Sequence, residues 1–138
     1  MNVMLSFAGS HDPFAPSPLS GEMNAGPVLT VASSHTFAHI YLFSTPRMAE
    51  QTKATALELR KRYPSTTTHI CDAPLKDPTN YLGILRQIRL HFKVIRTSHP
   101  EADFYIAVSS GTPHMHATWV MLAASGEIPA TILQSTPP

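Results

Sequence analysis

One short stretch, residues 103–115, changes from a β-rich run to a capped helix start within a few residues. Residues 104–108 are rich in aromatic and β-branched side chains, enough for a buried strand and too few for a helix. A small-residue turn of Ser109, Ser110 and Gly111 follows; Thr112 is a suitable N-cap, and Pro113 fits the first helical position. The pattern predicts a strand, a tight turn and a helix that begins at Pro113.

The same alternation of strand and helix runs through the chain. Strands are predicted over residues 2–7, 38–43, 66–71, 104–108 and 128–133. The helices predicted between them cover residues 28–34, 46–63, 77–95 and 113–125, although residues 28–34 could also form a short strand. Asp77-Pro78 is the expected cap of the third helix, and its apolar stripe is expected to begin at Tyr81. Such alternation predicts an α/β fold: a Rossmann-like, doubly wound, mainly parallel sheet of five or six strands with helices on both faces. Trp119 is expected in the core.

One segment, residues 13–27, does not follow this alternation. It holds four prolines and two glycines, and its apolar residues show little periodicity. We therefore expect an irregular excursion, and loops of this length inside compact domains tend to be functional or mobile.

Composition narrows the class of protein. A chain of 138 residues with 43% hydrophobic content is expected to form one domain, residues 1–138. The net charge of +1 argues against direct binding of duplex DNA. The single cysteine, Cys71, excludes an internal disulfide, and with the lack of a signal peptide it favours a cytoplasmic location. No apolar run reaches the roughly 20 residues needed to span a membrane.

The predicted sheet also places a binding site. Ligands of such sheets bind outside the carboxyl ends of the strands where the strand order reverses, here between the first and fourth predicted strands. The loops after these two strands should face each other, and a helix N-terminus above the sheet suits an anionic or phosphate-bearing ligand. An ordinary strand-to-helix connection would show the same residues, so that interpretation stays open. The candidate ligand-binding residues are Gly9, Ser10, His11, Asp12, Thr45, Arg47, Lys76, Ser109, Ser110, Gly111, Thr112, Pro113 and His114.

The sequence lacks the motifs that would indicate a dinucleotide, triphosphate or metal site. The sequence lacks Gly-x-Gly-x-x-Gly after the first strand and lacks the Gly-x-x-x-x-Gly-Lys of a P-loop, so no dinucleotide or triphosphate cofactor is expected. His114 and His116 are two residues apart and would lie on different faces of a helix, so no metal is expected. Basic residues of the long third helix (Arg86, Arg89, Lys93 and Arg96) are interpreted as a solvated outer face.

Taken together, these residues resemble a known family. The turn Ser110-Gly111-Thr112-Pro113-His114-Met115 is similar to the Gly-Thr-Pro turn after the fourth strand of CARF domains, the CRISPR-associated Rossmann-fold sensors. The fuller resemblance is to the N-terminal sensor domains of RtcR-like sigma-54-dependent regulators of RNA repair operons. It rests on Asp77-Pro78, on the 109–112 turn, on Ile128-Pro129-Ala130 through Leu133-Gln134, and on Pro137-Pro138.

The resemblance implies a sensor function. A homodimer would form one pocket for a cyclic oligoadenylate or another RNA-derived ligand, bound without efficient turnover. Fused AAA+ ATPase and DNA-binding domains are expected beyond Pro138. Two alternatives stay open: a metal-independent ring nuclease that cleaves the ligand with the help of His11, His114 or Lys76, and a generic small-nucleotide-binding Rossmann domain.

Overall fold

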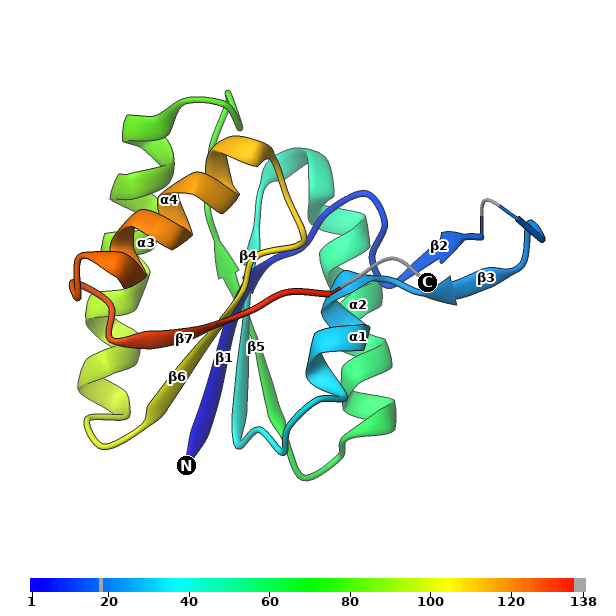
Figure 1. Ribbon diagram of the computed structural model, residues 1–138, viewed down its shortest axis with the longest axis horizontal. Helices are drawn as coiled ribbons and strands as arrows, with labels where there is room; N and C mark the ends of the chain where they lie inside the picture. The colour runs from blue at the N-terminus through cyan, green and yellow to red at the C-terminus, as the bar shows by residue number, and fades with distance from the viewer. Residues whose placement is uncertain (18, 136–138) are drawn as a thin grey trace.

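The computed structural model describes residues 1–17 and 19–135 and contains a five-stranded parallel sheet (Figure 1). Its strands are β1 (Asn2–Phe7), β4 (His39–Ser44), β5 (Thr67–Asp72), β6 (Asp103–Ala107) and β7 (Ala130–Leu133). The spatial order is β5-β4-β1-β6-β7, and every neighbouring pair is parallel. The predicted reversal of strand order between the first and fourth strands, β1 and β6, is therefore confirmed.

Helices cover both faces of the sheet. The short helix α1 (Pro27–Ala32) and α2 (Ala49–Arg62), which follows the 3₁₀ turn η1 (Pro46–Met48), lie on one side, and α3 (Tyr81–Ser98) and α4 (Pro113–Ala124) lie on the other (Figure 1). The fold is thus the predicted Rossmann-like, doubly wound sheet.

The side chains of β1 explain why this strand is central. Successive residues point to opposite faces, so Val3, Leu5 and Phe7 pack under α3 and α4 while Met4 packs under α1 and α2. All four are completely buried. A strand buried on both faces is mostly apolar and lacks strict alternation, and four of the six residues at positions 2–7 are apolar. Trp119 of α4 is fully buried against the ring of Phe7, as predicted.

The segment predicted as irregular contains a hairpin. β2 (Phe14–Pro16) pairs antiparallel with β3 (Met23–Ala25), and the hairpin projects away from the helix layer of α1 and α2 (Figure 1). Strands of three residues are too short to show a two-residue period, so the prolines and glycines dominated the pattern.

The start of α3 also differs from the prediction. Asn80, rather than Asp77-Pro78, caps this helix, because its side-chain oxygen accepts a hydrogen bond from the amide of Gly83 at 3.1 Å. Asp77 instead accepts from the amide of Thr79 in the preceding turn. The buried stripe begins at Ile84, whereas Tyr81, which we expected to be part of it, is 56% exposed.

Two smaller points concern the ends of the chain and of its elements. The last strand begins at Ala130 rather than at Ile128, which is buried just before it. Pro137-Pro138, which belongs to the resemblance, lies outside the described residues. Across residues 1–17 and 19–135, no helix combines the length and the apolar character needed to cross a membrane.

Candidate functional site

A cleft opens where the strand order reverses, above the carboxyl ends of β1 and β6. Its cavity volume is about 370 Å³. The loop after β1 forms one wall, the turn between β6 and α4 forms the other, and the start of η1 closes one side. The lining residues are Ala8, Gly9, Ser10, His11, Asp12, Pro27, Thr45, Arg47, Met48, Pro78, Ser109, Ser110, Gly111, Thr112 and Met115.

Asp12 fastens the two walls of the cleft to each other. Its carboxylate is buried and accepts three hydrogen bonds: from the amide of Gly9 at 2.8 Å, from the amide of Val28 at 3.0 Å and from the hydroxyl of Ser110 at 2.7 Å. These donors belong to the loop after β1, the first turn of α1 and the turn after β6. A buried carboxylate is stable only with such partners, and the N-terminal end of α1 adds a favourable dipole. Asp12 and Ser110 therefore shape the cleft by binding each other.

The turn after β6 is held from two further directions. The imidazole Nε2 of His116, one turn into α4, lies 3.0 Å from the carbonyl oxygen of Ser110 and donates to it. The amide of Ser135, after β7, donates to the hydroxyl of Ser109 at 2.8 Å. The turn is thereby tied to the helix that follows it and to the edge of the sheet.

Two glycines let these walls approach closely. A Cβ atom on Gly9 would lie 2.9 Å from the amide nitrogen of Gly111, so the loop could not sit there with a side chain. Gly111 has a φ of +93°, which L-residues rarely adopt, and a Cβ atom there would lie 2.6 Å from the sulfur of Met115. The cleft depends on glycine at both positions.

Thr112 begins α4 and ties it to the segment before α3. Its hydroxyl oxygen accepts from the amide of Met115 at 3.3 Å and donates to the carbonyl oxygen of Pro78 at 2.8 Å. The predicted N-cap is thus confirmed. Because both roles of the hydroxyl are taken by protein groups, a ligand would meet the amides and the helix dipole here more readily than this hydroxyl.

The electrostatics of the cleft suit an anion. Among the described residues, the amides of Ser10, His11, Ser110 and Gly111 donate to no acceptor, and all four residues line the cleft. The N-terminus of the twelve-residue helix α4 adds a partial positive charge. Arg47 is exposed at the rim and supplies a full positive charge.

One carboxylate lies near this rim. The hydrogen bonds that Thr79 donates to Asp77 lower the pKa of this carboxyl group, and the positive charges of His114 and Arg47 add smaller effects in the same direction. Asp77 therefore stays ionised at neutral pH, and it partly offsets the charge of Arg47.

Most of the candidate residues predicted from the sequence come together at the cleft. It brings together Gly9, Ser10, His11, Asp12, Thr45, Arg47, Ser109, Ser110, Gly111 and Thr112. Three of the candidates, Lys76, Pro113 and His114, do not line it. Lys76 is exposed after β5, and His114 packs its ring against Tyr81 with centroids 4.8 Å apart.

The structure adds residues that the sequence did not single out. Pro27, Met48 and Pro78 line the cleft because α1, η1 and the segment before α3 all begin at the same edge of the sheet. The proline-led helix starts were visible in the sequence and could have identified Pro27. Met115 lines the cleft beside Gly111, and only the positive φ of that glycine directs the chain so that they meet.

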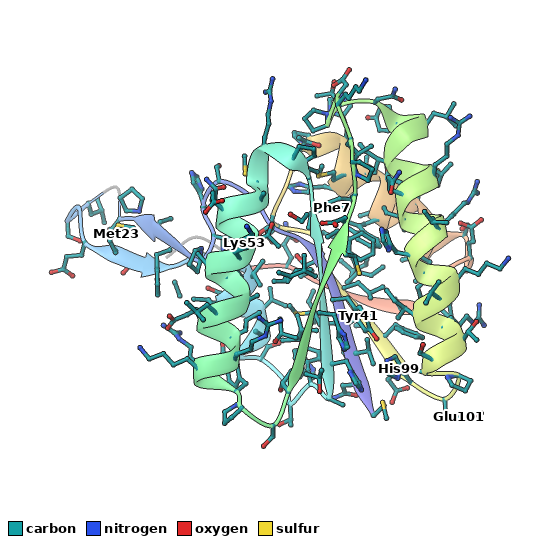
Figure 2. The ribbon with its side chains drawn as sticks, turned by 180° about the vertical axis from the view of Figure 1, so that it is seen from behind. Phe7, Met23, Tyr41, Lys53, His99 and Glu101 are labelled. Carbon is teal, nitrogen blue, oxygen red and sulfur yellow. The ribbon has the colours of Figure 1, made fainter. Side chains whose placement is uncertain are left out.

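A separate cluster of aromatic and imidazole rings lies at the opposite end of the strands, between the sheet and the C-terminal end of α3. His39 Nδ1 and His69 Nε2 are 3.0 Å apart. The Tyr41 hydroxyl is 2.7 Å from His99 Nε2, and Figure 2 shows these two residues at this end of the sheet. Burial lowers the pKa values of His39 and His69, and the neighbouring imidazoles lower them further. Within residues 1–17 and 19–135, no group of three histidine, cysteine or acidic side chains is arranged to hold a metal ion.

Comparisons with known proteins give a match at the level of structure. No protein-family model matches the sequence, and no curated protein sequence matches it. The fold is similar to that of Enterococcus italicus Csm6 bound to cyclic hexa-2'-fluoro-hexa-dAMP, with a TM-score of 0.80 and 18% identity. It is also similar to protein VC1899 from Vibrio cholerae (TM-score 0.58, 15% identity) and to Can2 from Sulfobacillus thermosulfidooxidans in complex with cyclic tetra-adenylate (TM-score 0.57, 16% identity).

These matches extend over nearly all of the present chain but only part of the others. They cover 99%, 95% and 99% of this chain, and 34%, 30% and 32% of Csm6, VC1899 and Can2 respectively. The chain therefore spans about a third of the length of the solved structures that share its fold. At these sequence identities the likeness establishes the fold alone.

Proposed function

We propose that this chain is a CARF-type sensor domain that binds a cyclic oligoadenylate, or a related RNA-derived nucleotide, in the cleft between β1 and β6. One observation carries the proposal: the cleft presents amides, a helix N-terminus and one arginine at the switch point of the sheet. Two structures of the same fold, Csm6 and Can2, were solved with cyclic oligonucleotides. The turn from Ser110 to Met115 adds the sequence resemblance.

The chemistry of the cleft fits phosphodiesters better than neutral ligands. Amides of Ser10, His11, Ser110 and Gly111 can each donate a hydrogen bond to a phosphate oxygen, and the partial positive charge of a helix N-terminus favours the same anion. Arg47 at the rim supplies the one full charge. A cleft of about 370 Å³ holds part of a cyclic oligonucleotide, so a complete site needs a second cleft facing the first.

A homodimer would supply that second cleft, and α4 offers a surface for it. The helix contains no Asp, Glu, Lys or Arg, and its outer residues Val120 and Met121 are 47% and 51% exposed. A helix that is apolar all round needs cover on its outer face as well as on its inner one. An open cavity of about 550 Å³ beside it is lined by Tyr81, Leu82, Leu85, Ala117, Thr118 and Met121.

This apolar cavity lies next to the cleft. Tyr81 lines the cavity and packs against His114 in the first turn of α4, and Pro78, three residues before Tyr81, lines the cleft. A second copy that covers α4 around a two-fold axis would bring its own cleft close to the first.

The identity of the effector belongs to the same proposal. We expect a longer protein in which this domain controls a fused AAA+ sigma-54 activator of the RtcR kind and its DNA-binding domain, in the cytoplasm. The support is the sequence resemblance and the fact that the chain corresponds to about a third of Csm6, VC1899 and Can2.

A ring nuclease is the second candidate, and one observation favours it. Of the three residues considered as catalysts, His11 lines the cleft, where its imidazole could act on a ribose 2'-hydroxyl or on the scissile phosphate. Lys76 and His114 do not line it. Cleavage by the ligand's own 2'-hydroxyl requires mainly orientation and charge stabilisation, so a single histidine would suffice as a base.

One experiment separates the candidates. The protein is incubated with stoichiometric cyclic tetra- or hexa-adenylate, and binding, stoichiometry and linear products are followed together. A sensor binds one ring per two chains and leaves it intact. Conversion to linear products with 2',3'-cyclic phosphate ends, lost in His11→Ala, identifies a ring nuclease. Binding of mononucleotides in preference to rings identifies a generic nucleotide-binding domain.

A further inference from the structure

The positive charge of the chain is concentrated on α3. This helix carries Arg86, Arg89, Lys93 and Arg96 and no acidic residue, although the whole chain has a net charge of only +1. All four residues are exposed. Arg86 and Lys93 lie on the side of the helix opposite to its buried residues, and Arg89 and Arg96 lie on the flank that faces Glu127. The rest of the chain is therefore net negative.

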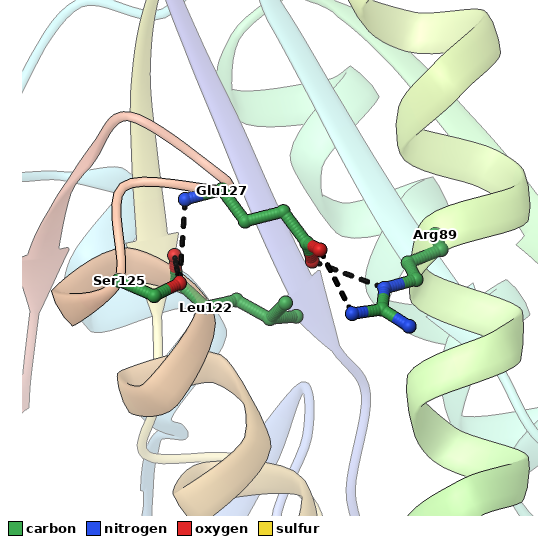
Figure 3. Close-up of polar contacts among 4 residues, drawn as sticks. All are labelled: Arg89, Leu122, Ser125 and Glu127. Atoms are coloured by element: carbon green, nitrogen blue, oxygen red, sulfur yellow. Dashed lines mark hydrogen bonds and ion pairs between the residues drawn. The ribbon is translucent and has the colours of Figure 1, made fainter.

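Only one of these four cations has an acidic partner within the described part of the chain. Arg89 forms a bidentate ion pair with Glu127 of the turn after α4 (Figure 3): its Nη2 donates to Oε1 at 2.8 Å and its Nε donates to Oε2 at 3.1 Å. The backbone amide of Glu127 binds the hydroxyl of Ser125, which fixes the turn on that side (Figure 3). Across residues 1–17 and 19–135, no ion pair involves Arg86, Lys93 or Arg96.

Exposed aliphatic side chains lie among these cations. Leu90 is 61% exposed and lies beside Arg86 and Lys93, whereas Val94, 64% exposed, lies on the flank of α3 away from Arg96. On a solvated face these positions would ordinarily be polar, since each aliphatic group left in water forgoes the stabilisation that burial gives. We define the basic face of α3 as Arg86, Leu90, Lys93 and Arg96.

A cavity borders this face. Its volume is about 370 Å³, and Arg89, Phe92, Lys93, Arg96, Thr97, Glu127 and Ile128 line it. Phe92 and Ile128 are buried and give it an apolar floor, and the cations form its rim. The cavity suits one apolar side chain whose neighbours carry negative charge.

We propose that the basic face of α3 is a docking surface for an acidic amphipathic helix of a partner protein. Charge complementarity selects the partner: carboxylates meet Arg86, Lys93 and Arg96, while one aliphatic side chain covers Leu90 and another enters the cavity over Phe92. Residues of a helix repeat at three and four positions, which matches the spacing from Arg86 to Leu90 and from Leu90 to Lys93.

Two other occupants fit the face less well. Single-stranded nucleic acid binds by stacking its bases on aromatic side chains, and the exposed apolar residues here are aliphatic. A second copy of this chain in a two-fold interface would set the cations of one copy against those of the other, with no acidic residue on the face to offset them. This surface is also distinct from the apolar cavity beside α4.

The test uses nitrogen-15-labelled protein and a synthetic 18-residue helical peptide with glutamates on one side and leucines on the other. Chemical-shift changes should map to the basic face of α3. The variant Lys93→Glu/Arg96→Glu should weaken binding about tenfold or more, since two attractive contacts become repulsive. The matched variant Lys53→Glu/Lys61→Glu makes the same charge change on exposed positions of α2 and should stay within about twofold.

Additional measurements distinguish the possible ligands of the basic face and check that each variant remains folded. Dispersed amide spectra show that each variant is folded. The proposal is overturned by equal binding of a scrambled peptide of the same composition, by shifts confined to another surface, or by equal effects of the two double variants. Tighter binding of a ten-nucleotide single-stranded RNA to the same face would replace the protein partner with a nucleic acid.

Discussion

The hydroxyl of Ser110 donates a hydrogen bond of 2.7 Å to the carboxylate of Asp12, although the two residues are 98 positions apart in the chain. The bond joins the loop after β1 to the turn after β6, the two walls of the cleft. Both residues are buried, with 4% and 3% of their surface exposed. Residues of the protein itself thus hold the two walls of the cleft together, and this bracing can be tested separately from the binding chemistry.

Replacing Ser110 or Asp12 should lower the free energy of unfolding, and the loss should be larger for Asp12. Ser110→Ala removes one of the three donors to Asp12 and should lower the free energy of unfolding by about 1 kcal/mol. Asp12→Ala leaves the amides of Gly9 and Val28 without their acceptor and should cost about 3 kcal/mol. Urea unfolding of the two variants measures both values. Equal losses would contradict the central role of Asp12.

Replacing two glycines that both have positive φ should separate backbone strain from steric conflict. Gly126→Ala places a methyl group where no atom lies within 4 Å, so only the strained φ of +79° contributes, about 1 kcal/mol. Gly111→Ala adds a methyl group 2.6 Å from the Met115 sulfur, and it should cost at least about 1 kcal/mol more. Thermal unfolding of both variants checks the order; a less stable Gly126→Ala protein would show that the walls at Gly111 can relax.

The ring cluster at the other end of the sheet predicts a pH dependence of stability. Burial, as the largest cause, lowers the pKa values of His39 and His69 below the ordinary 6.5. Below that pH the unfolded chain binds more protons at these sites than the folded chain does, so stability falls as the pH falls through 6.5 toward the lowered values. Above about pH 7 these groups are neutral in both states and contribute no slope.

Urea unfolding between pH 8 and pH 5 measures this dependence. The variant His39→Gln/His69→Gln should show a flatter profile over the same range, because two of the titrating groups are gone. Nuclear magnetic resonance titration gives the pKa values directly. Values above 6.5 for both histidines would contradict the assignment of burial as the main cause.

The sequence predicted the fold and the position of the cleft because both depend on local signals. Mostly apolar runs such as residues 3–7 mark strands buried on both faces, and the signals at Thr112 and Pro113 mark a helix start. The order of elements then places the reversal between β1 and β6 by a general rule of such sheets. These inferences need no knowledge of distant contacts.

Other features depend on contacts that a sequence pattern does not contain. Asp12 was predicted to bind ligand, but its partners Val28 and Ser110 lie far along the chain, so its role in holding the walls together emerged only from the structure. His39, His69 and His99 come from three elements, and no spacing links them. The cap of α3 was assigned to Asp77 because Asp-Pro is a strong local signal, whereas the geometry of the turn favours Asn80.

Arg47 should contribute to ligand affinity without contributing to folding. It is exposed at the rim of the cleft, so Arg47→Ala should leave the unfolding curve unchanged and weaken binding of a cyclic oligoadenylate about tenfold, through loss of one charged contact. Lys53→Ala, an exposed cation on α2 (Figure 2), is the matched control and should leave the affinity unchanged. Equal affinities of all three proteins would remove Arg47 from the site.

The most direct test of the proposed function is a titration of the protein with cyclic tetra-adenylate and cyclic hexa-adenylate by isothermal calorimetry at 0.15 M salt. Light scattering on the same samples gives the number of chains in the complex. We predict saturable binding of at least one ring, at one ring per two chains, and intact ligand recovered afterwards. Absence of binding by either ring at 100 µM protein, or saturation at one ring per single chain, would contradict the account.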